Sequence, residues 1–182
     1  MADVLFDRFP GHRVEVLGGL VSVEPLQDMC HARILSDVMA AFFRAGMRCD
    51  DRPRAIQRLA IWLPTGPFDY AIPDLSVVDP EIDDHMIEFN CYDPAVFRLV
   101  LEVTSSALGD ELTRKPAAYA SGGVPVYVIV DRTNQRVMVL TEPQGTEYRV
   151  RAVHHPGESF TLPESIGVSV TIPVNDLVVI RP

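Results

Sequence analysis

Two short runs of alternating apolar and polar residues stand near the start of the chain. "RVEVL" (13–17) and "LVSVE" (20–24) flank the pair Gly18-Gly19. Successive side chains of a strand point to opposite faces, and two glycines supply the positive φ angles of a tight turn. The pattern therefore predicts a β-hairpin over residues 13–25.

The next segment has the spacing of a helix. Asp28 is a suitable N-cap residue and Gly46 a suitable stop, so we expect a helix over about 28–45. Its apolar residues recur every three or four positions, which places one face on the core. They are Ile34, Leu35, Val38, Met39 and Phe42.

Three strands and a long loop are predicted in the middle of the chain. "AIQRLAIWL" (55–63) and "DLSVVD" (74–79) are short strands bounded by proline or glycine. Residues 80–97 are acidic and irregular, which indicates a long loop with a short strand near 86–89. "RLVLEV" (98–103) is almost continuously apolar, as in strands that are covered on both faces.

A helix and a second buried strand follow. Residues 107–123 have helical character up to Gly122-Gly123, but Pro116 leaves two alternatives. Either the regular helix starts near Thr113 or it bends at Lys115-Pro116, because proline is tolerated only in a first turn. "VPVYVIVD" (124–131) is the second strand, and the strand–helix–strand order predicts a right-handed parallel crossover.

The C-terminal part predicts antiparallel strands at 136–142 and 147–153, then short strands near 159–162 and 168–172. Strands outnumber helices, which favours an α/β (mixed α+β) fold in which helices pack against a mixed sheet. The length of 182 residues fits a single domain, 1–182.

Composition and charge narrow the range of functions. No apolar run is long enough to span a membrane, and no basic start precedes an apolar segment, so we expect a cytoplasmic protein without a membrane span. The net charge of −9 argues against sequence-blind attraction to nucleic acid.

Three charged residues stand out against this background. Glu102 interrupts an apolar strand, where an ionised carboxylate needs a compensating cation or donor. Lys115 is the only lysine among 16 lysine and arginine residues, and Asp74 opens a neighbouring candidate strand directly after a proline. An alternative stays open, in which Glu102 is a structural charge paired with Arg98 or Arg58.

These residues suit a metal site. If the two strands are neighbours, Asp74 and Glu102 can share a cation, and their hard oxygen ligands suit Mg²⁺ or Mn²⁺. The carbonyl of Val103 can reach the same ion, and Thr104 shares a face of the strand with Glu102. The ammonium of Lys115 can activate a water that attacks phosphorus or can neutralise charge in the transition state.

The same residues carry a family resemblance. Glu102-Val103, Ser105, Asp110, Lys115, Tyr119, Gly123-Val124, Tyr127 and Asp131 resemble the pattern of a bacterial restriction endonuclease family within the PD-(D/E)XK nuclease superfamily. The resemblance implies a restriction-endonuclease-like mixed sheet flanked by helices, with the N-terminal hairpin and extra antiparallel C-terminal strands.

The resemblance also implies roles for individual residues. Asp74 and Glu102 map to metal ligands, and Glu15 to a further acidic site residue. Thr104 stands where the superfamily usually carries a lysine, two positions after the second acid. In the family, a lysine of the following helix takes the place of that lysine, and this position corresponds to Lys115. Pro116 next to Lys115, Val128 in place of a tryptophan and the acidic loop 80–97 depart from the family pattern.

Two classes of function follow. The first is a metal-dependent endonuclease that hydrolyses DNA phosphodiester bonds, with a homodimer expected because a duplex has two strands to cut. The second is a catalytically inactive relative that keeps the fold as a binding or assembly module, since fold alone does not establish function. Hydrolysis of a small phosphate ester is a third, weaker alternative.

Overall fold

The computed structural model describes residues 12–24, 27–47, 53–104 and 113–178. Its strands form two six-stranded sheets and a two-stranded one, with the orders β2-β1-β5-β4-β8-β7, β12-β11-β10-β9-β6-β3 and β13-β14. None of the helices in the described ranges is long and apolar enough to cross a membrane.

The central sheet carries the buried strands. It consists of β3 (Arg54–Gln57), β6 (Leu75–Val78), β9 (Phe97–Thr104), β10 (Val126–Asp131), β11 (Arg136–Gln144) and β12 (Glu147–His154). β9 and β10 are parallel, with Glu102 opposite Ile129, whereas β6 runs antiparallel to β9, with Leu75 opposite Leu101. The predicted mixed sheet and its parallel strand–helix–strand unit are therefore confirmed.

The second six-stranded sheet contains the N-terminal hairpin. Its strands are β1 (Arg13–Leu17), β2 (Leu20–Glu24), β4 (Ala60–Trp62), β5 (Tyr70–Ala71), β7 (Met86–Glu88) and β8 (Cys91–Tyr92). Gly18 and Gly19 have φ angles of 59° and 73°, as the tight turn requires. The buried carboxylate of Asp69 accepts hydrogen bonds from both glycine N–H groups, at 2.6 and 3.1 Å, and so ties the turn to the loop before β5.

The two longer helices begin and end as their sequences predict. α2 (Met29–Arg44) starts where Asp28 accepts a hydrogen bond from the His31 N–H at 2.8 Å, and Gly46 follows its end with a φ of 94°. α3 (Arg114–Ser121) places Pro116 in its first turn, which decides between the two alternatives in favour of a start near Thr113. Residues 105–112, including Asp110, lie outside the described residues.

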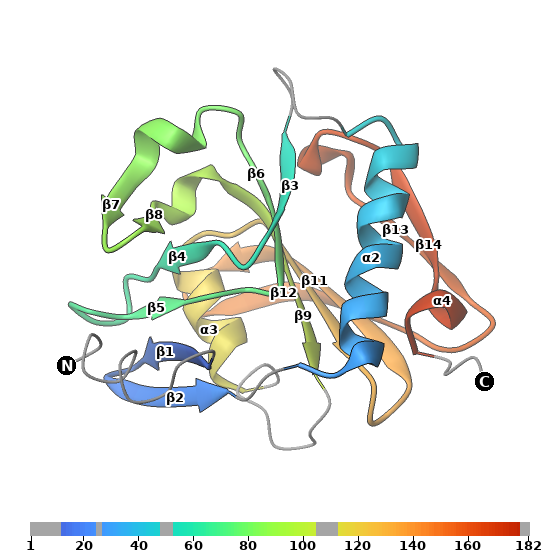
Figure 1. Cartoon of the computed structure of the whole chain (residues 1–182), viewed down its shortest axis with the longest axis horizontal. Coiled ribbons are helices and arrows are strands. Elements are labelled where there is room, and N and C mark those ends of the chain that lie inside the picture. The colour runs from blue at the N-terminus through green and yellow to red at the C-terminus, as the bar shows by residue number, and fades with distance from the viewer. Residues whose placement is uncertain (1–11, 25–26, 48–52, 105–112, 179–182) are drawn as a thin grey trace.

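Helices and sheets pack in layers (Figure 1). α2, the short helix α4 (Val174–Val178) and strands β13 (Ser159–Leu162) and β14 (Val170–Pro173) cover one face of the central sheet. α3 and the second six-stranded sheet pack on its other face. Alternation along β9 sends Leu99, Leu101 and Val103 toward α2, and therefore turns Val100 and Glu102 toward α3.

One predicted strand is wrong in its extent. Residues 55–63 form two strands, β3 and β4, because Arg58 between them adopts a left-handed φ of 57° that breaks the extended backbone. β3 pairs with β6 in the central sheet, and β4 pairs with β5 and β8 in the other sheet. The chain therefore crosses between the sheets at Arg58, which periodicity along one continuous apolar run did not reveal.

The predicted loop 80–97 is also more structured than expected. It contains 3₁₀ turns at Ile82–His85 and Pro94–Val96, and between them β7 and β8 form a small antiparallel hairpin. A single short strand was expected near 86–89. A third 3₁₀ turn, Glu164–Ile166, connects β13 to β14.

Candidate active site

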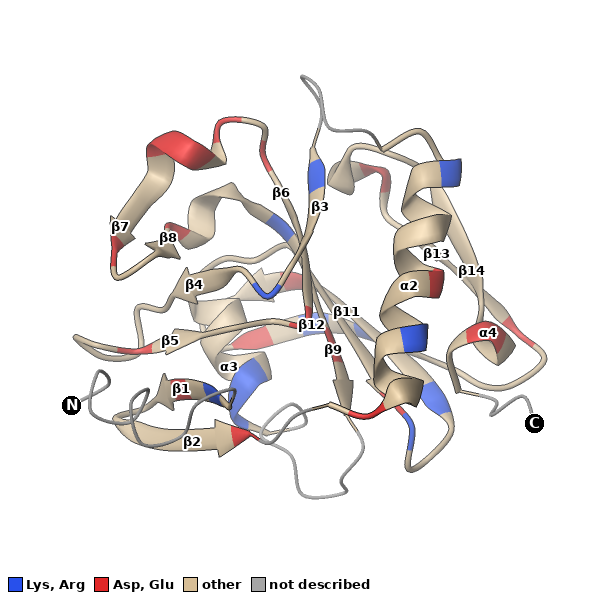
Figure 2. Cartoon of the chain, viewed as in Figure 1, with Lys and Arg blue, Asp and Glu red and all other residues tan. Residues whose placement is uncertain are grey.

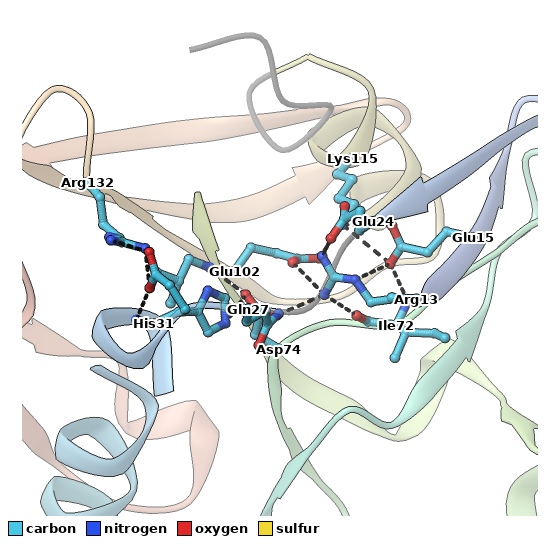
Figure 3. Close-up of polar contacts among 12 residues, drawn as sticks. Arg13, Glu15, Glu24, Gln27, His31, Ile72, Asp74, Glu102, Lys115 and Arg132 are labelled. Atoms are coloured by element: carbon cyan, nitrogen blue, oxygen red, sulfur yellow. Dashed lines mark hydrogen bonds and ion pairs between the residues drawn. The ribbon is translucent and has the colours of Figure 1, made fainter. Parts of the chain in front are cut away.

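Asp74 and Glu102 come together because β6 and β9 are neighbours. Asp74 directly precedes β6, and its Oδ2 accepts a hydrogen bond from the Val103 N–H at 2.7 Å. Both acidic residues have 0 % solvent exposure. A single nitrogen, Nη1 of Arg13, lies 2.8 Å from Asp74 Oδ1 and 3.4 Å from Glu102 Oε2 (Figure 3). One cation therefore reaches both carboxylates at once.

Lys115 approaches Glu102 from the first turn of α3. Its Nζ lies 2.8 Å from Glu102 Oε1 and 3.0 Å from Glu15 Oε2, and the side chain has 0 % exposure. Pro116 does not turn the lysine away, because it occupies a helix position whose N–H has no intrahelical partner. The amine therefore points inward, at the carboxylates.

The N-terminal hairpin adds two more carboxylates. Glu15 on β1 is fully buried, and its Oε1 accepts a hydrogen bond from the Ile72 N–H at 2.6 Å. Glu24 at the end of β2 pairs with Arg13 across the hairpin, and its side chain keeps 28 % exposure. Basic and acidic residues therefore lie close together where β1, β2 and α3 come together (Figure 2).

Sequence reasoning missed Arg13. Its guanidinium contacts Asp74 and Glu102 as described above, pairs with Glu24 and donates to the Ile72 carbonyl at 2.8 Å. A signal was present in the alternation, since Arg13 and Glu15 are two positions apart on one strand and must share a face.

Three other residues contact Asp74 or Glu102. His31, in the first turn of α2, is buried with Nε2 at 3.3 Å from Asp74 Oδ2. Tyr119, which the sequence analysis named only as part of the family pattern, has a buried hydroxyl that donates to Glu102 Oε1 at 2.8 Å. Gln27 donates to Asp74 Oδ1 at 2.6 Å.

The alternative ion pair of Glu102 is wrong in its partners. Arg98 lies on the same strand but pairs with Asp79, and Arg58 is exposed in the crossing between β3 and β4. Glu102 is compensated by Lys115 and Arg13 instead. The buried charge is therefore part of a larger cluster and not a simple surface pair.

Burial and mutual attraction set the ionisation of the cluster. Complete burial raises the pKa of Glu102 above the ordinary value, against the attraction of Lys115 and Arg13. Burial alone would lower the pKa of Lys115, but the charges of Glu102 and Glu15 outweigh it and raise that pKa. The pKa of Arg13 is raised in the same way by Glu102, Glu15 and Asp74, against its burial. Both cations thus stay charged at neutral pH.

The residues fit a divalent ion of the hard type. Among the described residues, no three His, Cys, Asp or Glu side chains form a ready-made metal cage. Mg²⁺ does not need one, because it keeps several waters and is bound through one or two carboxylates. Asp74 Oδ1 and Glu102 Oε2 face one point, which Nη1 of Arg13 occupies, so the carboxylates offer hard oxygen ligands on the same side of the cluster.

Two further predicted site residues lie at the end of β9. Val103 contributes its N–H to Asp74, while the role of its carbonyl as a metal ligand stays a prediction. Thr104 is buried, and its carbonyl accepts a hydrogen bond from the Arg132 N–H at 3.1 Å. Its participation in the site also stays a prediction.

Comparison with known proteins relates the chain to one protein family and to solved structures. The model of the Uma2 family, described as "Putative restriction endonuclease", matches residues 4–175. A crystal structure described as a putative nuclease belonging to DUF820, from Anabaena variabilis ATCC 29413, superposes with a TM-score of 0.67 at 17 % identity and covers 90 % of this chain and 88 % of that one. No curated protein sequence matches the chain. The shared architecture confirms the predicted restriction-endonuclease-like fold.

Proposed function

The chain belongs to the Uma2 restriction endonuclease family, and from that premise we propose that it is a metal-dependent nuclease that hydrolyses DNA phosphodiester bonds. The observation that carries this proposal is the meeting of Asp74, Glu102 and Lys115 around one buried point. Two carboxylates and an amine are the groups that a PD-(D/E)XK nuclease needs, with the lysine supplied here by α3 and not by the strand.

Asp74, Glu102 and the Val103 carbonyl would hold the ion, for which we propose Mg²⁺ or Mn²⁺. Such an ion stabilises developing charge on a phosphate and lowers the pKa of an attacking water. Tyr119 and Lys115 hold Glu102 Oε1, while the Val103 N–H and His31 hold Asp74 Oδ2. These contacts orient both carboxylates so that their other oxygens, Asp74 Oδ1 and Glu102 Oε2, lie toward Nη1 of Arg13.

Lys115 has the role of a positively charged group beside the reacting phosphate. It is anchored by Glu102 and Glu15, which keep it protonated and aimed at the cluster. A positioned ammonium orients a water or stabilises charge that develops in the transition state. Glu15 therefore serves as a positioning residue for the lysine.

DNA is the proposed substrate, and a homodimer is the proposed assembly because both strands of a duplex must be cut. Cleavage of a supercoiled plasmid with Mg²⁺ or Mn²⁺ tests the activity, and sedimentation velocity tests the assembly. We expect wild-type protein to nick or linearise the plasmid and Glu102→Gln to lose at least about a hundredfold in rate, as for loss of a group that stabilises transition-state charge.

The matched control is Asp79→Asn. Asp79 pairs with Arg98 at the opposite end of β9 from the site, so this variant also loses a carboxylate on the central sheet. It is expected to keep activity and Mn²⁺ binding. Equal activity of wild type and Glu102→Gln would contradict the proposed roles, even if some cleavage were observed.

One observation favours the second candidate, an inactive relative that serves as a binding or assembly module. Asp74, Glu102 and Lys115 all have 0 % exposure, so a phosphate does not contact them in this arrangement. Calorimetry with Mn²⁺ separates the two candidates before any cleavage assay. A protein that binds no divalent ion and cuts no single-stranded, duplex or branched DNA would be such a module.

A further inference from the structure

Nη1 of Arg13 occupies a position from which it contacts both Asp74 and Glu102. Each carboxylate has one oxygen already held by the protein. Asp74 Oδ2 is bound by the Val103 N–H and His31, and Glu102 Oε1 is bound by Lys115 and Tyr119. The other two oxygens, Asp74 Oδ1 and Glu102 Oε2, both face Nη1 of Arg13 (Figure 3), and Asp74 Oδ1 also accepts a hydrogen bond from the neutral amide of Gln27 at 2.6 Å.

A divalent ion shared by Asp74 and Glu102 would need these same two oxygens. The guanidinium is a permanent cation and cannot leave by losing its proton. Two cations at one point repel each other, so the arginine and the ion exclude each other from that point.

The structure also provides Arg13 with a second partner outside this point. Its Nη2 pairs with Glu24, which lies directly opposite Arg13 in the β1–β2 register and is partly exposed. Rotation of the side chain toward Glu24 would remove the positive charge from the two inner oxygens and leave the guanidinium in an ion pair, while the neutral amide of Gln27 would stay on Asp74 Oδ1. The contact of Nη1 with the Ile72 carbonyl would be lost in that movement.

We propose that Arg13 is the internal cation that holds Asp74 and Glu102 together in the metal-free protein and yields their inner oxygens to the divalent ion, remaining anchored by Glu24. This inference rests on the proposed metal site. The exchange has a regulatory consequence, because the affinity for the divalent ion depends on its competition with Arg13 for the two carboxylates. The concentration of the divalent ion has to exceed a threshold, set by the competition with Arg13, before the ion occupies the site.

Titration calorimetry with Mn²⁺ on the full chain tests the exchange. Arg13→Gln removes the competing charge, and we expect it to bind Mn²⁺ more tightly by about tenfold or more, within the range of ordinary coupling between two sites. Arg132→Gln is the matched control, because it also removes an arginine from an ion pair near the site, with Asp28, and is expected to leave the affinity within about threefold of wild type by the same comparison.

The outcomes separate the two proposals. Tighter binding by Arg13→Gln, or binding by Arg13→Gln alone, supports the exchange. Equal or weaker binding by a folded Arg13→Gln overturns it while the proposed metal site stands. Absence of Mn²⁺ binding in both proteins overturns the metal site and the exchange together.

A measurement on wild type keeps the proposal testable if Arg13→Gln does not fold. The Nε–H resonance of Arg13, assigned through its own backbone by NMR, is followed during titration with Mg²⁺. We expect it to shift with the same dissociation constant that calorimetry gives. A resonance that stays in place while Mg²⁺ binds would overturn the exchange.

Discussion

The ammonium of Lys115 lies 2.8 Å from Oε1 of Glu102, so the only lysine of the chain pairs with the one glutamate of β9. Both are completely buried. Each charge needs compensation at that place, because desolvation of an isolated ion costs several kcal/mol, and each is the nearest opposite charge of the other. The pair therefore links the stability of the domain core to the chemistry proposed for the site.

Lys115→Met tests this link. Methionine keeps much of the volume of lysine but leaves the buried acidic cluster without one of its cations. We expect a loss of about 3–5 kcal/mol in the free energy of unfolding at neutral pH, as for other broken buried pairs. Urea unfolding followed by circular dichroism measures it.

Arg114→Met is the matched control for Lys115→Met. Arg114 is the preceding residue in α3 and is exposed, so its substitution should change the free energy of unfolding by no more than about 0.5 kcal/mol. Equal stability of the two variants would contradict the buried ion pair.

Tyr119→Phe removes a hydroxyl that donates to Glu102. At about pH 9, above the pKa of Glu102, which burial raises to about 8, the loss of a hydrogen bond to the ionised carboxylate typically costs about 1.5–3 kcal/mol, so we expect that decrease in the free energy of unfolding at that pH. Tyr148→Phe provides the comparison, because its hydroxyl donates to the Val124 carbonyl, a neutral acceptor, at 2.8 Å. That variant should lose only about 0.5–1.5 kcal/mol, and the reverse order would contradict an ionised Glu102.

Asp69→Ala should loosen the N-terminal hairpin. The carboxylate accepts from the Gly18 and Gly19 N–H groups and from the Thr65 hydroxyl, the last at 2.6 Å. Without it the turn is held only by its strand pairing. We expect the Gly18 and Gly19 amides to exchange with solvent at least about tenfold faster in hydrogen-exchange NMR, which corresponds to about 1.4 kcal/mol. The amides of β10, which lies in the central sheet away from the turn, should change their exchange rates by much less.

Asp131→Asn should destabilise the protein in a pH-dependent way. Burial alone would raise the pKa of Asp131, but hydrogen bonds from Asn134 and the charge of Arg136 outweigh it and lower that pKa. A group with a lowered pKa in the folded state stabilises the fold above its unfolded pKa of about 3.9 and loses that effect as the pH falls through the folded value. The difference between wild type and Asp131→Asn should thus be constant from neutral pH to about 5 and shrink below about 4.

Urea unfolding at several pH values measures the effect of Asp131→Asn. Asp37→Asn, on the exposed side of α2, serves as its control and should show a difference near zero throughout. A destabilisation by Asp131→Asn that grows in acid would contradict the assignment.

Local pattern was sufficient for much of the fold. Alternation around Gly18-Gly19 predicted the hairpin, capping residues bounded α2, and the apolar runs predicted β9 and β10. These signals are local, because each depends on the backbone conformation of a few consecutive residues. They failed at Arg58, where a single left-handed residue sends one apolar run into two sheets.

The candidate site was predicted in part. A glutamate in an apolar strand, an aspartate after a proline and a unique lysine are all visible in the sequence, and the structure brings all three together. Arg13 was missed, and Tyr119 was named only as part of the family pattern, because an arginine at the start of a strand and a tyrosine in a helix have many ordinary uses.

What the sequence determined by itself is therefore the set of elements and the identity of the charges that need compensation. The tertiary structure alone decided which charges meet, such as Lys115 with Glu15 across 100 positions of the chain and Arg13 with Glu102 across 89. Such pairs depend on how the hairpin sheet packs over α3 and the central sheet. Periodicity indicates which face of a helix or strand is buried. It carries no information about which other helix or strand packs against that face.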